Sequence, residues 1–333
     1  MPRPPKSKRP VVAVVVPCYR VGERVLDVLK GIGDEVDHIV VVDDACPDNV
    51  AELVKTRCRD SRLIVVRHDR NRGVGGATLS GYKRALEAGA DVIVKIDGDG
   101  QMDPAEIPRF IAPILIGEAD YAKGNRFHDL AAIKGMPALR ILGNLVLSFA
   151  AKLSSGYWNV FDATNGYTAI HGRVASRLPF ERISRTFFFE SDMLFHLYGL
   201  GAVVVDVPMR ARYGGEKSNL RILKILPEFT AKHLRNIFAR IFVTYVLKDF
   251  SMSSVELVLG GLFLPFGIIL GALEWCQSIA TGVPATAGQV LLAALPIIVG
   301  TQFLIAFLNV DTRAMPKTPL YPRLDPGATR GER

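Results

Sequence analysis

The sequence contains few cysteines and no recognisable nucleic-acid-binding pattern. Only four of the 333 residues are cysteine (Cys18, Cys46, Cys58 and Cys276), and no two of them stand in a CxxC spacing. A zinc ribbon or a disulfide framework is therefore not indicated, and reduced cytosolic thiols are the simpler interpretation. No helix-turn-helix, zinc-finger or RNA-recognition pattern is present, so we expect no nucleic-acid partner.

A secretory leader is also not indicated. The first apolar run, VVAVVV, ends after six residues at Pro17, which is shorter than the apolar region of a signal peptide. Residues 1–9 are basic and rich in proline, and we expect a disordered arm there. The bulk of the chain is accordingly expected in the cytoplasm.

Apolar residues and positive charge are abundant. Hydrophobic residues make up 49% of the chain and the formal net charge is +8, while the mean hydropathy is +0.22. The hydrophobic content and the mean hydropathy point to membrane segments. The positive net charge points to an anionic partner, such as a phosphorylated substrate or acidic lipid headgroups. The length allows one large domain and an appendage.

Residues 10–218 alternate β-branched runs with helical periodicity, which is typical of an α/β domain with a mainly parallel sheet. Several of the runs are apolar throughout, as expected when helices cover both faces. Asp103, Pro104 and Glu106 predict a helix start with a capping box. The expected strands are Val11–Val16, His38–Val42, Leu63–Arg67, Val92–Ile96, Tyr121–Gly124 and Ala202–Val207. The expected helices are Glu23–Ile32, Asn49–Cys58, Ala77–Ala88, Pro104–Ile116 and Ala138–Leu153.

The composition changes after Gly215. Residues 219–252 interleave basic side chains with apolar ones at helical spacing. This pattern predicts amphipathic helices lying in a membrane interface. A core helix with a solvated basic face is the alternative.

Two long apolar segments, Val255–Ala280 and Ala287–Val310, lie within residues 253–310. Each is long enough to cross a bilayer, and prolines within them are tolerated in membrane helices. The connection at 281–286 has no Lys or Arg, whereas basic residues flank the pair, so both ends and the tail 311–333 are expected in the cytoplasm. A buried helical hairpin of a soluble protein is the alternative.

The sharpest chemical signal is Asp97-Gly98-Asp99-Gly100-Gln101, directly after an apolar strand. Carboxylates at the end of such a strand project into the crevice where open α/β folds bind ligands. Carboxylate oxygens suit Mg²⁺ or Mn²⁺ shared with substrate phosphates. An EF-hand loop fits poorly, because Met102 and Pro108 stand where Gly and Glu are required. A structural turn remains an alternative.

Two further segments follow strands. Asp43 and Asp44 end the run 38–42, where an acidic side chain often binds ribose hydroxyls, although it can equally cap the next helix. Asn71-Arg72-Gly73-Val74-Gly75-Gly76 opens a helix but lacks the third glycine of the dinucleotide fingerprint, since Thr78 stands there. Its glycines permit close approach of a nucleotide, or form a simple loop.

Basic residues gather later in the chain. Arg126 lies in GNRF, and Arg212, Lys217 and Ser218 lie in the stretch before the amphipathic region. Arginine and lysine bind phosphates, so a lipid-phosphate site is one interpretation of their placement and solvated surface charge is the other.

The order of these motifs resembles the family 2 glycosyltransferases, and within them the polyprenyl-phosphate branch. The motifs are VPCY, VVDDACPDN, NRGVGGA, DGDGQMDP, GNRF, FDATNGYTAI, FFFESD and YGGEKS, followed by two apolar segments. The resemblance implies a GT-A fold for residues 10–218. It also implies inverting, metal-dependent transfer of a hexose from a GDP-mannose- or UDP-glucose-type donor to a polyprenyl phosphate.

The resemblance also implies residue roles. Pro17 and Tyr19 would contact the nucleotide, as would Asp43, Asp44, Asn71 and Gly73. Asp97, Asp99 and Gln101 would hold Mg²⁺ or Mn²⁺ and the diphosphate, with Asp99 as the direct ligand. Arg126, Arg212, Lys217 and Ser218 would bind the acceptor phosphate, and Arg126 would also act in catalysis. The chain departs from the family at Arg20-Val21, where relatives often have Asn-Glu, and at Lys217-Ser218, where many have Ser-Lys.

Other functions fit less well. A processive polysaccharide synthase would carry a QxxRW motif and more apolar spans, and a nucleotidyltransferase would not require an apolar hairpin. A different acceptor, or a membrane-tethered nucleotide-binding scaffold without transfer activity, remains open, as does homo-oligomerisation. The expected location is the inner membrane of a bacterium.

Overall fold

A computed structural model gives the fold for residues 9–128, 138–209 and 222–324. The chain divides into two compact units: unit 1 contains residues up to Asn236 and those from Pro316 onward, and unit 2 contains Ile237–Met315. The predicted arm 1–9 lies almost wholly outside the described residues, as do Arg212, Lys217 and Ser218.

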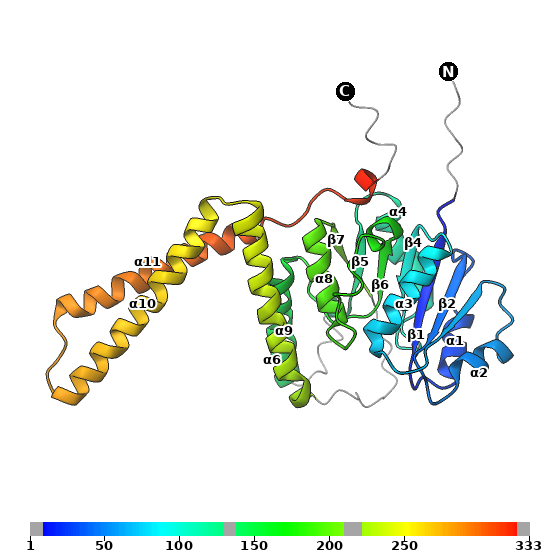
Figure 1. The fold of residues 1–333 in the computed structure, drawn as a ribbon, viewed down its shortest axis with the longest axis horizontal. Helices are drawn as coiled ribbons and strands as arrows, with labels where there is room; N and C mark the ends of the chain where they lie inside the picture. The colour runs from blue at the N-terminus through cyan, green and yellow to red at the C-terminus, as the bar shows by residue number, and fades with distance from the viewer. Residues whose placement is uncertain (1–8, 129–137, 210–221, 325–333) are drawn as a thin grey trace, which may run out of the picture. The chain divides into compact units, whose positions relative to one another are not determined.

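Unit 1 is built on a seven-stranded mixed sheet with the order β3-β2-β1-β4-β6-β5-β7 (Figure 1). All its strands run parallel except β6, which is antiparallel to both β4 and β5. The strands are β1 (Val12–Cys18), β2 (His38–Asp43), β3 (Leu63–Arg67), β4 (Val92–Lys95), β5 (Tyr121–Asn125), β6 (Thr168–His171) and β7 (Val204–Pro208).

The six predicted strands agree with β1 to β5 and β7 to within two residues at each end, and the mixed α/β fold is confirmed. The strand that the sequence did not predict is β6, within the FDATNGYTAI motif. It has only four residues, all buried, so it shows neither alternation nor length. Its antiparallel direction matters for function, because it brings the amino end of β6 beside the carboxyl end of β4.

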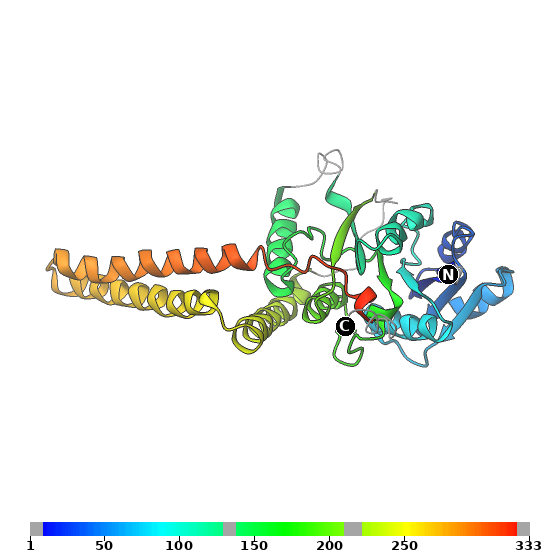
Figure 2. The same cartoon turned by 90° about the horizontal axis from the view of Figure 1, so that it is seen from above.

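Helices cover both faces of the sheet (Figures 1 and 2). On one face α1 (Arg24–Lys30), α2 (Val50–Arg57) and α4 (Ile107–Leu115) pack on Val12, Val14 and Val16. On the other face α3 (Gly73–Glu87), α6 (Ala138–Ser155), α7 (Gly172–Ala175) and α8 (Phe189–Leu200) pack on Ala13 and Val15. Because successive strand residues face opposite ways, a strand covered on both sides must be apolar throughout.

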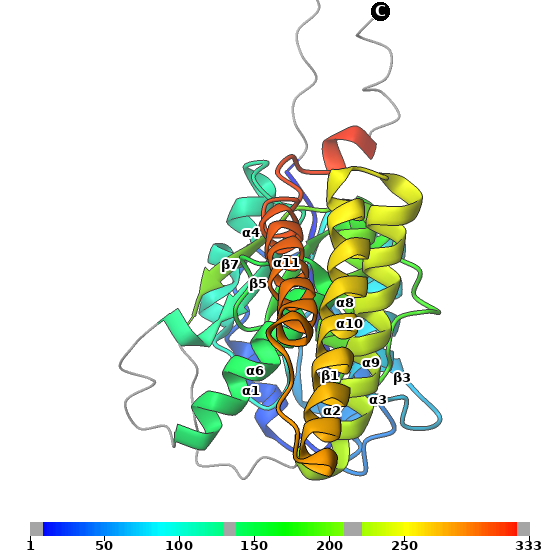
Figure 3. The same cartoon turned by 90° about the vertical axis from the view of Figure 1, so that its left-hand side faces the viewer.

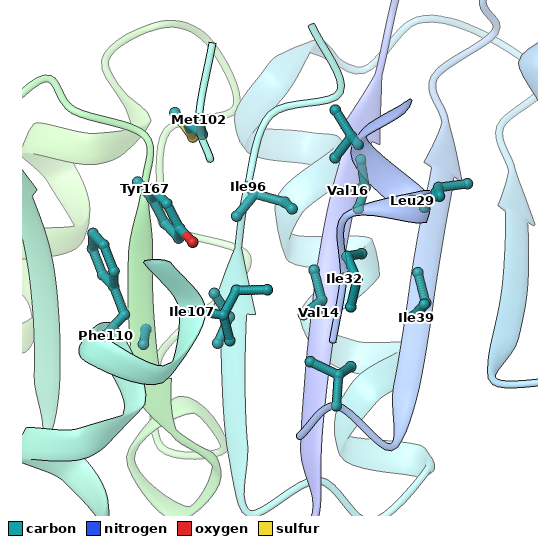
Figure 4. Close-up of a cluster of buried hydrophobic side chains, with 14 of the residues drawn as sticks. Val14, Val16, Leu29, Ile32, Ile39, Ile96, Met102, Ile107, Phe110 and Tyr167 are labelled. Atoms are coloured by element: carbon teal, nitrogen blue, oxygen red, sulfur yellow. The ribbon is translucent and has the colours of Figure 1, made fainter. Parts of the chain in front are cut away.

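Figure 4 shows the hydrophobic side chains buried on the face covered by α1, α2 and α4, where Phe110 of α4 lies beside Tyr167. The two rings are stacked with centroids 3.9 Å apart. The start of the α4 region is as predicted at Asp103, whose carboxylate accepts the Ala105 amide at 3.1 Å, before the short helix η1 (Pro104–Glu106). The capping box is replaced, since the Glu106 carboxylate pairs with Arg109.

Helix α9 (Ile222–Phe242) lies within the predicted amphipathic stretch, and its residues up to Asn236 belong to unit 1. In its described part, Leu226 and Leu234 are exposed, whereas His233 and Asn236 are buried. His233 Nδ1 lies 2.8 Å from Ser154 Oγ, and the Asn236 amide donates to Asp192 at 2.8 Å. This part of α9 therefore buries some polar side chains and exposes some apolar ones, and because Glu228 and Arg235 are exposed as well, its outer face is mixed.

The residues after the apolar segments return to the sheet. Leu320 and Tyr321 donate their amides to the buried Asp120 carboxylate at 2.7–2.9 Å. The ring of Tyr321, the first residue of the short helix η4 (Tyr321–Leu324), stacks on His171 with centroids 4.0 Å apart. From the sequence we expected a cytoplasmic tail at 311–333, and the contact with Asp120 was not foreseen.

Unit 2 contains a π-helical turn η3 (Val243–Lys248) and two long helices, α10 (Met252–Thr281) and α11 (Ala287–Asp311). Figure 3 and Figure 1 show the two helices side by side. In the most apolar 18-residue stretch of each, only 11% and 17% of the residues are buried. A core hairpin would be mostly buried, so these helices fit a membrane better than a protein interior.

Arg240, Tyr245 and Asp311 form a buried cluster within unit 2. The Arg240 guanidinium donates to both Asp311 oxygens, at 2.6 and 3.1 Å, and the Tyr245 hydroxyl donates to the same carboxylate at 2.7 Å. Such a bidentate pair fixes the end of α11 against the segment that precedes α10.

Candidate active site

One end of the sheet collects most of the predicted site residues. We call this end the site edge: it is formed by the carboxyl ends of β1, β2, β4, β5 and β7 and by the amino end of β6. Thr168 at the start of β6 pairs with Lys95 at the end of β4. The DGDG and DATNGY motifs, 65 residues apart in the sequence, therefore meet there.

Asp97 and Asp99 lie half-buried in the turn after β4. Asp99 Oδ1 accepts the amide of Gln101 at 3.0 Å, so Gln101 shapes the turn through its backbone. Burial raises the pKa of Asp99 above its ordinary value; the Gln101 amide opposes this shift and the nearby Asp97 carboxylate adds to it. A bound cation would offset both the burial and the repulsion.

Lys95 is a residue of this site that the sequence interpretation missed. Its ammonium is buried and lies 2.9 Å from Asp97 Oδ1 and 3.0 Å from Glu190 Oε1. The contact with Asp97 is a charge pair rather than a well-aligned hydrogen bond. A charged residue inside an otherwise apolar buried strand was the signal available, because lysine is almost never fully buried unless it is paired.

Asp43 and Asp44 are buried and already engaged by the chain itself. Asp43 accepts the amides of Cys46 at 2.7 Å and Ala51 at 2.9 Å, which fixes the start of α2. Asp44 accepts the amides of Arg72 and Gly73 at 2.8 and 2.9 Å, and its Oδ1 lies 2.7 Å from His68 Nδ1. Asp43 therefore holds the start of the next helix, α2, whereas Asp44 holds the start of α3.

The glycine-rich first turn of α3 packs against another segment of the chain. The amides of Gly75 and Gly76 donate to the Arg185 carbonyl at 3.0 and 3.3 Å. A Cβ at Gly73 would lie 2.5 Å from that carbonyl oxygen, and one at Gly75 would lie 2.5 Å from the Ser184 oxygen. These glycines admit a protein backbone, while Asn71 accepts the Gly73 amide at 3.0 Å.

Arg126 follows β5 and is held by a bidentate contact. Its Nε and Nη2 donate to the two oxygens of Asp162 at 2.7 and 2.9 Å, and its backbone amide also donates to Asp162. The guanidinium is therefore positioned beside the DATNGY loop, at the same sheet end as Asp97.

Pro17 and Tyr19 stand at the carboxyl end of β1. Pro17 pairs with Val42 inside the sheet, whereas Tyr19 is 44% exposed with the Arg20 guanidinium 5.3 Å from its ring centroid. Tyr19 is thus available at the surface of the site edge, and Pro17 supports it from within the strand.

The residues present suit a cation that is shared with a ligand. Among the described residues no group of three or more His, Cys, Asp and Glu side chains could hold a metal ion. Mg²⁺ is commonly bound by one or two carboxylates together with substrate phosphates rather than by a complete protein cage. Asp97 and Asp99 fit this kind of incomplete site.

A mixed sheet with helices on both faces and paired carboxylates at the site edge defines the GT-A class of fold. Glucosyl-3-phosphoglycerate synthase of Mycobacterium tuberculosis, solved with Mn²⁺, UDP and glucosyl-3-phosphoglycerate, superposes with a TM-score of 0.51. The two chains are 17% identical, and the superposition covers 72% of this chain and 86% of the synthase. At this identity the likeness concerns the fold.

Sequence comparison identifies the family. Residues 13–178 match the model of glycosyl transferase family 2. A UDP-N-acetylglucosamine–dolichyl-phosphate N-acetylglucosaminyltransferase of Methanococcus voltae is 33% identical over 173 residues, covering 48% of this chain and 68% of the relative. An undecaprenyl-phosphate mannosyltransferase of Micrococcus luteus is 30% identical, covering 60% and 82%. The chain belongs to glycosyl transferase family 2, and it is a glycosyltransferase.

Proposed function

We propose that the protein transfers a hexose from a nucleotide-sugar of the GDP-mannose or UDP-glucose type to a polyprenyl phosphate, with inversion at the anomeric carbon. The observation that carries the proposal is the Asp97–Asp99 pair at the site edge of a chain that also contains two poorly buried apolar helices. Both relatives described above are named for transfer to a polyprenyl phosphate, dolichyl in one case and undecaprenyl in the other.

Asp97 and Asp99 would hold Mg²⁺ or Mn²⁺ on the diphosphate of the donor, with Asp99 as the direct ligand. When bound, the cation neutralises charge on the departing nucleoside diphosphate. Tyr19 at the end of β1 would contact the nucleotide. The buried Asp43 and Asp44, together with Asn71 and Gly73, would act by shaping the loops around it.

A phosphate acceptor fits the side chains at this edge. A phosphate monoester is already ionised near neutral pH, so its oxygen needs no strong base to attack the sugar. A hydroxyl acceptor would need a general base. Glu190, the buried carboxylate beside Asp97, is paired with the Lys95 ammonium, which favours the phosphate over a hydroxyl.

Arg126 would offset repulsion between the two phosphates, because its guanidinium is positioned by Asp162 at the same sheet edge. Arg212, Lys217 and Ser218 are proposed as further acceptor ligands on the strength of the family motif alone. Preorganised cations of this kind stabilise charge that develops during transfer without reorganising.

The exposed apolar surfaces of the protein would contact the bilayer. Besides α10 and α11, exposed apolar residues lie on α9, at Leu226 and Leu234, and on α6, at Val146 and Phe149. Helices with this pattern lie in a membrane interface. The basic residues that flank the two spans would keep both ends of the chain in the cytoplasm.

The test is a panel of nucleotide-sugars offered with a short polyprenyl phosphate, with and without Mg²⁺ or Mn²⁺. We expect one donor to yield a polyprenyl-phosphate sugar and free nucleoside diphosphate, and EDTA to stop the reaction. A free-sugar or glycan acceptor supplied in parallel identifies a different acceptor. Nucleotide binding without release of nucleoside diphosphate would instead indicate a tethered scaffold, and the proposal would be abandoned.

A further inference from the structure

Lys95 ends β4 directly beneath the two-aspartate turn. Its side chain is 1% exposed, and it bridges the Asp97 carboxylate to the Glu190 carboxylate of α8. Burial by itself would lower the pKa of Lys95, but Asp97 and Glu190 outweigh burial and raise the pKa above its ordinary value. The residue is therefore a buried ammonium ion between one carboxylate of the proposed site and one carboxylate outside it.

The backbone of the DATNGY loop covers this ammonium. A Cβ at Gly166 would lie 2.5 Å from Lys95 Nζ and 2.7 Å from Asp97 Oδ2. Only glycine allows the loop to approach so closely. The ion pair is thus enclosed by main chain on one side and by α8 on another.

We propose that Lys95 is the positioning residue of Asp97: anchored by Glu190 and enclosed at Gly166, its ammonium fixes the direction of the Asp97 carboxylate toward the donor diphosphate and its cation. This inference rests on the proposed function, which gives Asp97 its ligand. Groups that hold a metal-ligating carboxylate in place typically contribute about 10- to 100-fold to metal affinity or activity.

A second effect of Lys95 is on charge. Asp97, Asp99 and Glu190 gather at one edge of the sheet, and like charges at close range repel one another. The ammonium lies between Asp97 and Glu190 and so offsets part of their mutual repulsion. Removal of the ammonium alone therefore perturbs both folding and ligand binding, and the experiment must separate the two.

The experiment compares four full-length proteins in the same detergent: wild type, Lys95→Met, Glu190→Gln and the double variant Lys95→Met/Glu190→Gln. Mn²⁺ binding is followed by electron paramagnetic resonance, with Mn²⁺ alone, with UDP and with GDP as probes. Thermal unfolding of each protein is measured in parallel. Asp120→Asn, a substitution at the opposite end of the sheet, serves as a destabilised control.

For Lys95→Met we expect weaker Mn²⁺–nucleotide binding and a lower melting temperature, because two carboxylates lose their counter-ion. In the double variant the uncompensated Glu190 charge is gone, so the melting temperature recovers toward the wild-type value. Its Mn²⁺ affinity remains about 10- to 100-fold weak. Glu190→Gln keeps an oxygen for the ammonium, so its Mn²⁺ affinity stays close to that of the wild type.

Recovery of Mn²⁺ affinity together with stability in the double variant would overturn the inference, since Lys95 would then only balance charge. Loss of affinity in Asp120→Asn would overturn it as well, because affinity would merely follow stability. A wild type that transfers sugar without binding Mn²⁺ refutes the role of Lys95 and leaves the proposed acceptor standing. A wild type that neither binds Mn²⁺ with UDP or GDP nor transfers sugar refutes both proposals.

Discussion

The two ends of the sheet carry aspartates in similar number but use them differently. At the amino ends of the strands, which we call the tail edge, Asp37, Asp91 and Asp120 accept backbone amides of Val12, Val11 and the 320–321 segment. At the site edge, Asp43 and Asp44 are engaged in the same way. Asp97 faces a lysine ammonium, and Asp99 accepts the backbone amide of Gln101.

The comparison teaches that an aspartate at a strand end is not by itself evidence of a ligand site. What distinguishes Asp97 and Asp99 is their partner: a side-chain cation for one, and for the other an amide of its own turn. A carboxylate satisfied by several amides is a structural element, because such hydrogen bonds stabilise its charged form and hold the loops that donate them. The predictions below test this difference.

The largest effect is expected for Asp99→Ala. Loss of the proposed cation ligand removes several kcal/mol of charge stabilisation from the transition state. This loss corresponds to a decrease in kcat of about a thousandfold or more. Folding and membrane insertion should be unchanged. Sugar transfer to polyprenyl phosphate is the measurement, and Asp103→Ala, which removes a cap from the same loop, is the matched control. Full activity of Asp99→Ala would exclude the residue as a ligand.

Arg126→Ala should reduce turnover by about 10- to 100-fold, since a preorganised cation is lost from the site edge. The change also leaves the buried Asp162 without its bidentate partner. Kinetics of Asp162→Asn, which retains the guanidinium, separate the two effects. If the kinetics of Arg126→Ala match those of the wild type, the arginine does not contact the reacting phosphates.

At the tail edge, Asp120→Asn should affect stability rather than donor binding. The amide nitrogen would face the backbone donors of Leu320, Tyr321 and Val203, at a cost of about 1–3 kcal/mol. Thermal unfolding and the rate of proteolysis within 316–324 measure the effect. Asp91→Asn, at an exposed position, should change either quantity less. An unchanged melting temperature of Asp120→Asn would show that the docked tail contributes little.

The smallest effect concerns pH. Burial lowers the pKa of His171 to about 4, with a further contribution from Arg173. The unfolded chain therefore binds more protons between pH 4 and about 6.5, so stability is complete above this range and is lost as the pH falls through it. We expect a loss of about 1 kcal/mol at pH 5 relative to pH 7, measured by thermal unfolding.

His171→Asn is the matched variant for this pH effect, because asparagine can also cap α7. Its stability should depend less steeply on pH than that of the wild type. Burial lowers the pKa of His233 to about 4 as well, so part of the slope should persist in the variant. An equal slope in both proteins would mean that His171 does not titrate in this way.

Much of the fold was predictable because the strands of a parallel sheet are apolar throughout and the helices between them are periodic. Strand Leu63–Arg67 was predicted to the residue, and α10 and α11 within a few residues. The motif order identified the family. What sequence patterns could not supply was β6 at Thr168–His171, because four buried residues carry no periodic signal.

The site was predictable in part for a related reason. Asp97 and Asp99 follow an apolar strand and were singled out, and the structure places them at the site edge. The neighbour of the glycines at the start of α3 was not predictable from residue type, because glycine allows any group to approach closely. In the structure, the backbone of Ser184 and Arg185 lies against Gly73 and Gly75. Which chain segment fills such a gap depends on contacts more than 100 residues apart in the sequence.

The sequence alone therefore determined the α/β alternation, the family and the two apolar spans, because each is encoded by neighbouring residues within a few turns or strands. Tertiary structure decided which carboxylates are satisfied by the chain itself, that Lys95 lies between Asp97 and Glu190, and that residues 320–321 dock on Asp120. These features depend on long-range pairing, above all on the antiparallel β6, which brings the loop at 165–167 over the end of β4.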